Sequence, residues 1–201
     1  PNLEPEQLYG LDISFDRTNK TNLTYSVSTF YYNYKDMIDF VYGLPVIALN
    51  RSDISSNGLE TNISYKINQN LDLDLGYTYL RVDDINNVDP ILYRPKHKFI
   101  SSIKHKSKNI SNIISMRYQS KQDYQDFLSD DREYEGSEIK FPIEQLDSLI
   151  LFNYIGIYEL NNNDKVSLKI SNLFDKQYEL IQDFPMPGSC LLYTSDAADD
   201  N

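Results

Sequence analysis

Apolar and polar residues alternate along several segments of this chain, most clearly in residues 71–79. Leu or Tyr occupies every odd position of this segment, and Asp, Gly or Thr occupies every even position. Successive side chains of a strand point to opposite faces, so the pattern predicts a strand with one apolar and one polar face. Residues 59–67 alternate in the same way, and the polar segment 68–70 between the two predicts a hairpin.

The alternation predicts further strands at about residues 7–16, 23–28, 99–103, 114–118, 146–160 and 165–172. Residues 146–160 are apolar at odd and even positions alike, so their faces are not assigned. Short turns near residues 17, 68, 107 and 162 alternate with longer connections at 35–56, 83–96, 120–144 and 175–188. Outer-membrane barrels have short turns at one rim and long loops at the other. We therefore predict an all-β fold, an antiparallel transmembrane β-barrel segment of about eight strands.

The same pattern predicts which side chains face lipid. They are the apolar members of three hairpin strands: Ile63, Tyr65, Leu71, Leu73, Leu75, Tyr77, Val166, Leu168 and Ile170. Asp72 and Asp74 alternate with them and are expected to face the lumen. Two carboxylates at this spacing could form an acid–base or metal pair, but a lumen face requires polar side chains in any case. We therefore expect a structural role for both.

Composition narrows the classes of protein that fit. The chain has 201 residues, 40% of them hydrophobic, and no run reaches the roughly 20 apolar residues that a spanning helix needs. Tyr is abundant and Trp is absent, and an aromatic set of this kind suits strands and the interfacial girdles of barrels. The net charge of −11 argues against nucleic acid, because phosphate contacts need clustered Lys and Arg. Cys190 is the only cysteine, so no internal disulfide is expected.

Several short motifs resemble those of TonB-dependent outer-membrane receptors. The strongest is the Asn-Leu-Phe-Asp-Lys-x-Tyr-Glu segment that begins at Asn172 and follows an alternating strand. The residues that carry the resemblance are Asn2, Pro5, Glu6, Asp36, Ile38, Gly58, Glu60, Arg94, Pro95, Asn172, Leu173, Phe174, Asp175, Tyr178, Pro187 and Gly188. They cover about residues 1–188, and their order is most similar to the C-terminal part of the vitamin B12 and siderophore receptor group.

The resemblance implies a barrel of about 22 strands, of which this chain would supply roughly a third. It implies energy-coupled uptake of a ferric siderophore, haem or cobalamin, a location in the outer membrane, and no enzymatic activity or cofactor. The implied partners are outer-membrane lipid, an N-terminal plug domain, the TonB complex and a small-molecule or metal-chelate ligand. Two alternatives remain: a passive porin or structural barrel, and a soluble periplasmic β-sandwich that binds sugar or protein.

The loop at residues 122–138 is the first candidate for a ligand site. It is rich in Tyr, which can stack on a ligand, and in carboxylates, which can bind polar groups or calcium. The candidate residues are Tyr124, Asp126, Asp130, Asp131 and Tyr134. Their spacing does not match an EF-hand, we assign no metal site, and a simple solvated loop is the alternative.

The two histidines and the missing catalytic motifs complete the site prediction. His97 and His105 are each flanked by lysines, which predicts hydrated turn or lumen positions and not metal ligands. No Gly-x-Ser-x-Gly elbow, Gly-rich phosphate loop or Cys-His cluster occurs, so no catalytic residue is proposed.

The two ends of the chain differ from what the resemblance implies. Residues 1–20 show no signal peptide, so we expect a fragment of an exported protein. After Gly188 the family continues with an alternating last strand, whereas residues 189–201 end in an acidic, Ala-containing run. We expect residues 189–201 to be a non-native or disordered tail that leaves the strand at 165–172 with an unpaired edge.

Overall fold

Nine long strands form one sheet in the part of the chain that the structure describes, in the order β1-β2-β5-β6-β7-β8-β13-β14-β17. The computed structural model describes residues 3–18, 22–41, 47–50, 53–85, 91–135, 138–161 and 164–197. Every neighbouring pair in the sheet is antiparallel. The strands are Gln7–Thr18 (β1), Leu23–Lys35 (β2), Ile54–Asn68 (β5), Leu71–Asp84 (β6), His97–Ser107 (β7), Ile110–Gln119 (β8), Leu149–Glu159 (β13), Asp164–Ser171 (β14) and Cys190–Ala197 (β17).

Register across the sheet shows that one face is apolar and the other polar. Side chains of cross-strand partners share a face, so a row can be followed from strand to strand. An apolar row contains Tyr65, Leu73, Ile103, Ile114, Tyr154, Ile170 and Leu191. The adjacent polar row contains Thr24, Ser64, Asp74, Ser102, Ser115 and Asn153. The residues predicted to face lipid all lie on the apolar face, and Asp72 and Asp74 lie on the polar face.

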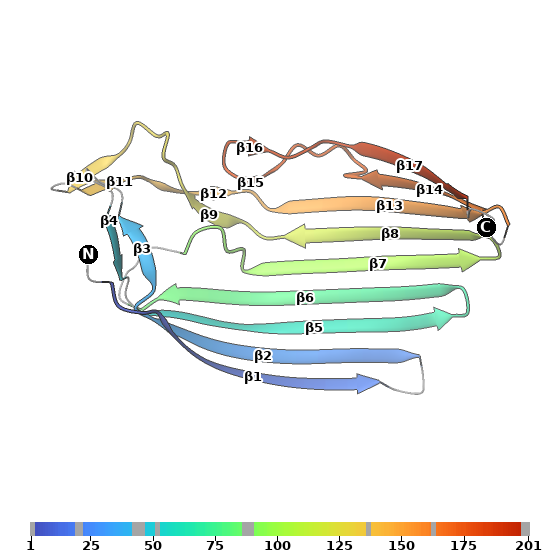
Figure 1. Cartoon of the computed structure of the whole chain (residues 1–201), viewed down its shortest axis with the longest axis horizontal. Helices are drawn as coiled ribbons and strands as arrows, with labels where there is room; N and C mark the ends of the chain where they lie inside the picture. The colour runs from blue at the N-terminus through green and yellow to red at the C-terminus, as the bar shows by residue number, and fades with distance from the viewer. Residues whose placement is uncertain are drawn as a thin grey trace.

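The sheet has one end with short turns and one end with long connections (Figure 1). Ser107 pairs with Ile110 across one of the short turns, and Asn68 pairs with Leu71 across another. We call the opposite end, where the long connections lie, the loop end. Its small strands are Ile38–Val41 (β3), Ile47–Asn50 (β4), Gln122–Gln125 (β9), Glu133–Glu135 (β10), Glu138–Lys140 (β11), Ile143–Leu146 (β12), Glu179–Ile181 (β15) and Phe184–Pro185 (β16). The predicted segregation of turns and loops is confirmed.

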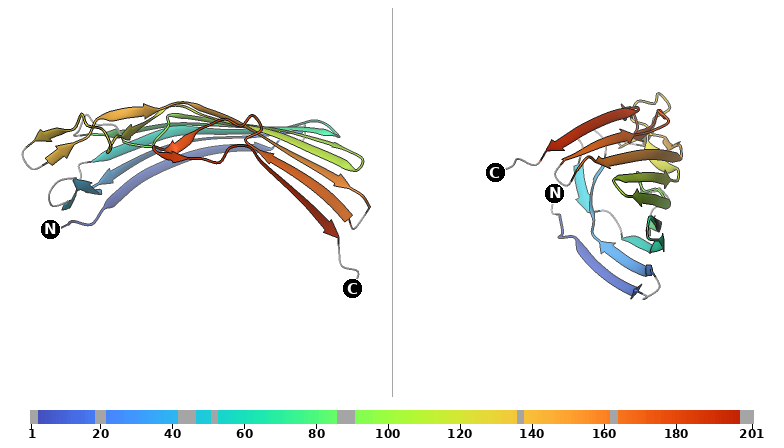
Figure 2. Two further views of the ribbon diagram at one scale, coloured as in Figure 1. Left: turned by 90° about the horizontal axis from the view of Figure 1, so that it is seen from above. Right: turned by 90° about the vertical axis from the view of Figure 1, so that its right-hand side faces the viewer.

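The sheet is a curved, open wall (Figure 2). Strands β1 and β17 form its two edges and do not pair with each other in the described residues. Side chains in the middle of the apolar face are exposed, including Ile103 at 49% and Ile114 at 51%. No described residue belongs to a helix that is long and apolar enough to cross a membrane.

The ninth strand corrects the prediction for the end of the chain. Residues Cys190–Ala197 pair with β14, from Ser171 opposite Cys190 to Asp164 opposite Ala197. The edge of β14 is therefore paired, and the expectation of an unpaired edge is wrong. Leu191 and Tyr193 alternate with Thr194, whose hydroxyl lies 2.6 Å from that of Ser167. The acidic residues that suggested disorder come only at the end of this alternating run. A foreign origin of this segment stays a prediction, and residues 198–201 lie outside the described residues.

Candidate functional site

Tyr124, the first predicted ligand residue, is buried and serves the packing of the loop end. It lies on β9, which pairs with β12 and places Tyr124 opposite Glu144. The Tyr124 hydroxyl donates to Glu144 Oε2 at 2.8 Å. Burial and, next, this hydrogen bond raise the pKa of the Tyr124 phenol to about 12. The phenol is therefore neutral at neutral pH, and its ring is packed within the loop end.

Strand β9 joins three of the long connections. Buried Gln122 donates from Nε2 to the Leu180 carbonyl at 2.8 Å, and Gln119 donates to Gln122 Oε1 at 3.2 Å. The Tyr93 amide donates to the Asp123 carbonyl at 2.8 Å. The connections that contain residues 93, 123 and 180 are thus tied together. Sequence reasoning missed Gln122, because nothing local in the sequence marks a side chain that bonds a partner 58 positions away.

The other predicted ligand residues lie on the exposed part of the same connection. Asp126 accepts a hydrogen bond from the Leu128 amide at 3.0 Å, which closes a short turn. Asp130 and Asp131 are exposed, and Tyr134 is 69% exposed. The structure therefore separates buried Tyr124 from the four others. Leu128, which is 77% exposed, is an apolar contact surface that sequence reasoning missed.

Carboxylates and histidines do not form a metal centre in the described residues. No group of three or more His, Cys, Asp or Glu side chains is arranged there to hold a metal ion. Asp74 instead accepts hydrogen bonds from the hydroxyls of Ser64 at 2.6 Å and Ser102 at 3.4 Å. This arrangement fits the structural role expected for Asp74 on the polar face.

His97 is not at the hydrated turn or lumen position predicted for it. Register places it opposite Tyr79 on the apolar face, near the loop end. Its Nδ1 shares a hydrogen bond of 2.8 Å with the Tyr77 hydroxyl, and both tyrosine rings lie close to the imidazole. Strand β7 begins at His97, so the alternation of the strand already includes this residue and places it on the same face as Phe99 and Ile103. An aromatic cluster of this kind suits the membrane–water interface.

The Asn-Leu-Phe-Asp motif has a structural explanation centred on Asn172. This buried residue has a φ of 49°, a left-handed conformation that Asn tolerates better than most residues. Its amide donates to Asn153 Oδ1 at 3.0 Å, its Nδ2 donates to the Lys176 carbonyl at 2.9 Å, and its Oδ1 accepts from the Lys176 amide at 2.9 Å. The Asn172 side chain therefore closes the turn after β14, and its backbone amide ties this turn to β13.

The rest of the motif fixes the path towards β17. Asp175 Oδ1 accepts a hydrogen bond from the Ser189 amide at 2.6 Å. A Cβ on Gly188 would lie 2.4 Å from the same oxygen, so a side chain at position 188 would disturb this contact. Phe174 packs edge-on against Phe152, with ring centroids 5.3 Å apart. The motif is therefore a loop-closing device and not a ligand site.

Motifs near the start of the chain form a second closing device. Glu6 Oε1 accepts a hydrogen bond from the Ile38 amide at 2.8 Å. Asp36 has a φ of 56°, and its carbonyl accepts from Asn50 Nδ2 at 2.6 Å. Asn50 also donates to the Glu4 carbonyl at 2.9 Å, a role that sequence reasoning missed.

The remaining motif residues allow close backbone packing, make backbone hydrogen bonds or lie beside the strands. A Cβ on Gly58 would lie 2.4 Å from the Tyr79 carbonyl oxygen, so only glycine fits. Pro95 is buried, and the Tyr178 carbonyl accepts from the Met186 amide at 3.0 Å. Asn2 lies outside the described residues. Pro5 precedes β1, and Glu60 lies on the polar face. The Leu173 amide donates to the Phe152 carbonyl, and the Pro187 carbonyl faces Asn172 Nδ2. Arg94 donates to the Tyr93 carbonyl.

The fold and the segregated loops define a segment of an outer-membrane barrel wall. A family model described as TonB dependent receptor-like, beta-barrel, matches residues 1–173, and the chain belongs to this family. The family consists of receptors and transporters of the outer membrane and not of enzymes. The apolar face is therefore the lipid-facing side and the polar face the lumen-facing side. The alternative of a soluble β-sandwich is wrong. No curated protein matches the chain in sequence.

Solved structures with the same fold include one transporter and two receptors. The copper transporter OprC superposes with a TM-score of 0.79 at 19% identity, over 98% of this chain and 31% of that one. The pyoverdine receptor FpvA from Pseudomonas aeruginosa PAO1, bound to pyoverdine, gives 0.77 at 16% identity, over 97% of this chain and 30% of that one. The ferric-catecholate import receptor Fiu from K12 E. coli gives 0.75 at 16% identity, over 98% and 28%. The chain spans less than a third of each.

Proposed function

We propose that this chain forms part of the wall of an energy-coupled receptor that imports a scarce nutrient across the outer membrane. The observation that carries the proposal is the family match over residues 1–173. The proposed ligand is a small metal chelate or metal-containing cofactor, such as a ferric siderophore, haem or cobalamin. The names of the similar structures support this class, since they describe a copper transporter, a pyoverdine receptor and a ferric-catecholate import receptor.

The wall has three proposed partners. Lipid covers the apolar face, an N-terminal plug domain of the complete receptor fills the lumen, and the TonB complex supplies the energy. The wall itself would hold the plug and carry the outer loops. Among these loops, the exposed segment 126–134 is the proposed contributor to ligand capture, because it presents Asp130, Asp131, Tyr134 and Leu128 to solvent.

Energy coupling separates this function from that of a passive porin. The complete gene would be expressed in a host that lacks its own receptors, with and without a working TonB complex. Radiolabelled ferric catecholate, ferric hydroxamate, haem and cobalamin would be supplied as separate probes. We expect accumulation of one probe that disappears when the TonB complex is absent. Uptake that continues at the same rate without the complex would support the porin instead.

A test of ligand capture by this loop requires a deletion that is shorter than residues 122–138. Residues Gln122 and Tyr124 are buried, so removing 122–138 would damage the loop end itself. Replacing only 127–134 by a short Gly-Ser linker leaves β9 and β12 paired. We expect weaker binding of the transported probe with normal amounts of barrel in the outer membrane. Unchanged affinity would rule out this segment as a ligand contact.

A further inference from the structure

The lumen-facing side of the wall is divided into two halves of opposite charge. The charged residues of β1, β2, β5 and β6 on this face are carboxylates apart from one lysine: Asp12, Asp16, Glu60, Lys66, Asp72, Asp74 and Asp84. Those of β7, β8, β13 and β14 are cations apart from one glutamate: Lys98, Lys104, Lys106, Arg117, Glu159, Lys165 and Lys169. We call these the acidic half and the basic half.

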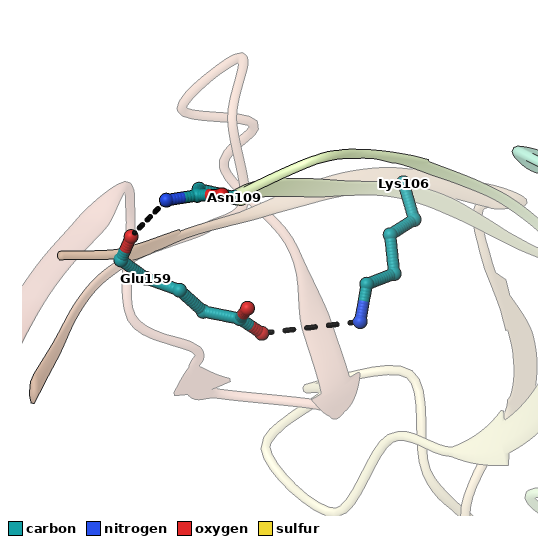
Figure 3. Close-up of polar contacts among 3 residues, drawn as sticks. All are labelled: Lys106, Asn109 and Glu159. Atoms are coloured by element: carbon teal, nitrogen blue, oxygen red, sulfur yellow. Dashed lines mark hydrogen bonds and ion pairs between the residues drawn. The ribbon is translucent and has the colours of Figure 1, made fainter. Parts of the chain in front are cut away.

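The basic half runs against the overall composition of the chain. The sequence has 30 acidic and 19 basic residues, so an unbiased face would be acidic. Its six cations are all exposed on the isolated wall. Its one carboxylate, Glu159, lies 3.9 Å from Lys106 Nζ and also accepts a hydrogen bond at its carbonyl from Asn109 (Figure 3). Register places Lys165 opposite Glu159 on β13 and opposite Asp196 on the edge strand β17, so these carboxylates offset part of the charge. Six cations against two carboxylates still leave this side with a net positive charge.

Apolar side chains lie between these cations. Ile113 is directly opposite Ile155 on the lumen-facing side, and Ile157 lies two residues further along β13. Ile100 on β7 is 54% exposed. In the cross-strand row of Ile100, the acidic half carries Gly76, Asn62 and Ser26. Ile113, Ile155 and Ile157 are half-buried. Apolar side chains are not needed on the lining of a water-filled channel, so this surface is suited to contact with a protein.

The extent of the basic half indicates the size of the partner. Lys98 and Lys106 are eight residues apart on one strand, which corresponds to roughly 26 Å at about 3.3 Å per residue. Three strand spacings of about 4.8 Å separate β7 from β14. A small chelate touches only part of such an area, whereas a folded domain covers it.

We propose that the basic half is the docking surface for an acidic and apolar face of the plug domain, and that the acidic half receives a basic face of the same domain. This inference rests on the proposed function, which supplies the plug. The charge division would then fix the rotation of the plug inside the barrel, because a turned plug would bring like charges together.

Two serines at the same level of the wall provide a matched test. Ser64 and Ser115 lie in one cross-strand row, on the acidic and the basic half respectively. A photoreactive amino acid would replace each in the complete receptor, and the crosslinked peptides would be identified by mass spectrometry. We expect Ser115 to capture acidic, apolar plug peptides and Ser64 to capture basic ones. Plug peptides of the opposite charge, or no plug peptide at Ser115 while Ser64 captures one, would overturn the docking proposal.

Charge reversal gives a second, independent measurement. The double change Lys104→Glu and Lys169→Glu should increase the conductance of the receptor in planar bilayers by about tenfold or more, because like charges would displace the plug. Lys66→Glu makes the same chemical change on the acidic half and should leave conductance near its original value. Equal conductance in both variants would overturn the proposal. TonB-dependent uptake by the unmodified receptor reports on the proposed function separately, and a complete receptor without a plug domain would overturn both.

Discussion

The loop end and the middle of the wall differ in where their stability comes from. The buried side chains gather at the loop end: Ile54, Ser56, Asp84, Gln119, Gln122, Tyr124, Leu149, Leu151 and Asn172. In the middle of the wall the apolar side chains of the lipid-facing side are half-buried or exposed, so backbone pairing is the main contact within the sheet. The wall therefore depends on lipid for its hydrophobic stabilisation, whereas the loop end is held by its own packing and hydrogen bonds.

Leu73→Arg in the complete receptor should have the largest effect, and it tests the dependence on lipid. Leu73 lies on the lipid-facing side, in the third position of β6, and pairs with Ile103 in the middle of β7. An arginine on this side costs about 2–4 kcal/mol at the bilayer midplane and less towards the interfaces. The neighbouring change Asp72→Asn lies on the lumen-facing side and should be tolerated. Folding titrations in lipid vesicles would measure both. Equal losses from the two variants would contradict the assignment of the faces.

Asn172→Ala should be next, and its effect should not depend on the lipid. The change removes a buried side chain that bonds both the amide and the carbonyl of Lys176, so we expect a loss of about 2–3 kcal/mol. Asn172→Gly relieves the left-handed backbone strain and separates that contribution from the lost hydrogen bonds. Measurements in bilayers of two thicknesses should give the same loss for Asn172→Ala. If the loss of stability changes with bilayer thickness, the loop end is not independent of lipid, and the distinction between the two regions is wrong.

These two variants also mark the limit of what the sequence predicts. Alternation was sufficient for the eight predicted strands, the position of Leu73 and the segregation of turns from loops, because those features follow from local periodicity. It was insufficient for the ninth strand, where Asp196 and the following residues hid the alternation of Leu191 and Tyr193. The motif at Asn172 was visible, but its role depends on contacts with another strand.

The separation of the ligand candidates into buried and exposed residues could not be predicted for the same reason. Tyr124 and Tyr134 have similar neighbours in the sequence, and only the pairing of β9 with β12 buries the first and leaves the second exposed. Long-range hydrogen bonds such as that from Gln122 to Leu180 decide this packing. A single sequence contains no local signal for such contacts.

Gly58→Ala should have an intermediate effect at the boundary between the two regions. The new methyl group would meet the Tyr79 carbonyl oxygen at 2.4 Å, and backbone atoms of a paired strand cannot move freely. We expect a loss of about 1–2 kcal/mol in the vesicle titration. Gly156→Ala is the matched control, because the nearest atoms to its methyl group belong to the Tyr154 side chain and not to backbone. The Tyr154 ring can move at the expense of its hydrogen bond to Asn112 Oδ1. A greater loss of stability for Gly156→Ala than for Gly58→Ala would contradict the prediction, because it would show that contacts with side chains constrain these glycines more than contacts with backbone.

Tyr124→Phe should have the smallest effect and a characteristic pH dependence. Phenylalanine keeps the buried ring and loses the hydrogen bond to Glu144, which is exposed and can bind water instead, so we expect a loss of about 0.5–1.5 kcal/mol at neutral pH. The pKa of Tyr124 is raised from 10.0 to about 12, so the folded state holds this proton more tightly than the unfolded state. The stabilisation is fully present below pH 10 and is lost as the pH rises through about 12. Hydrogen exchange of residues 122–146 in both proteins would isolate this contribution from the other tyrosines. A difference between the two proteins that stays constant from pH 9 to pH 12 would show that Tyr124 is not held in the neutral form by its buried site.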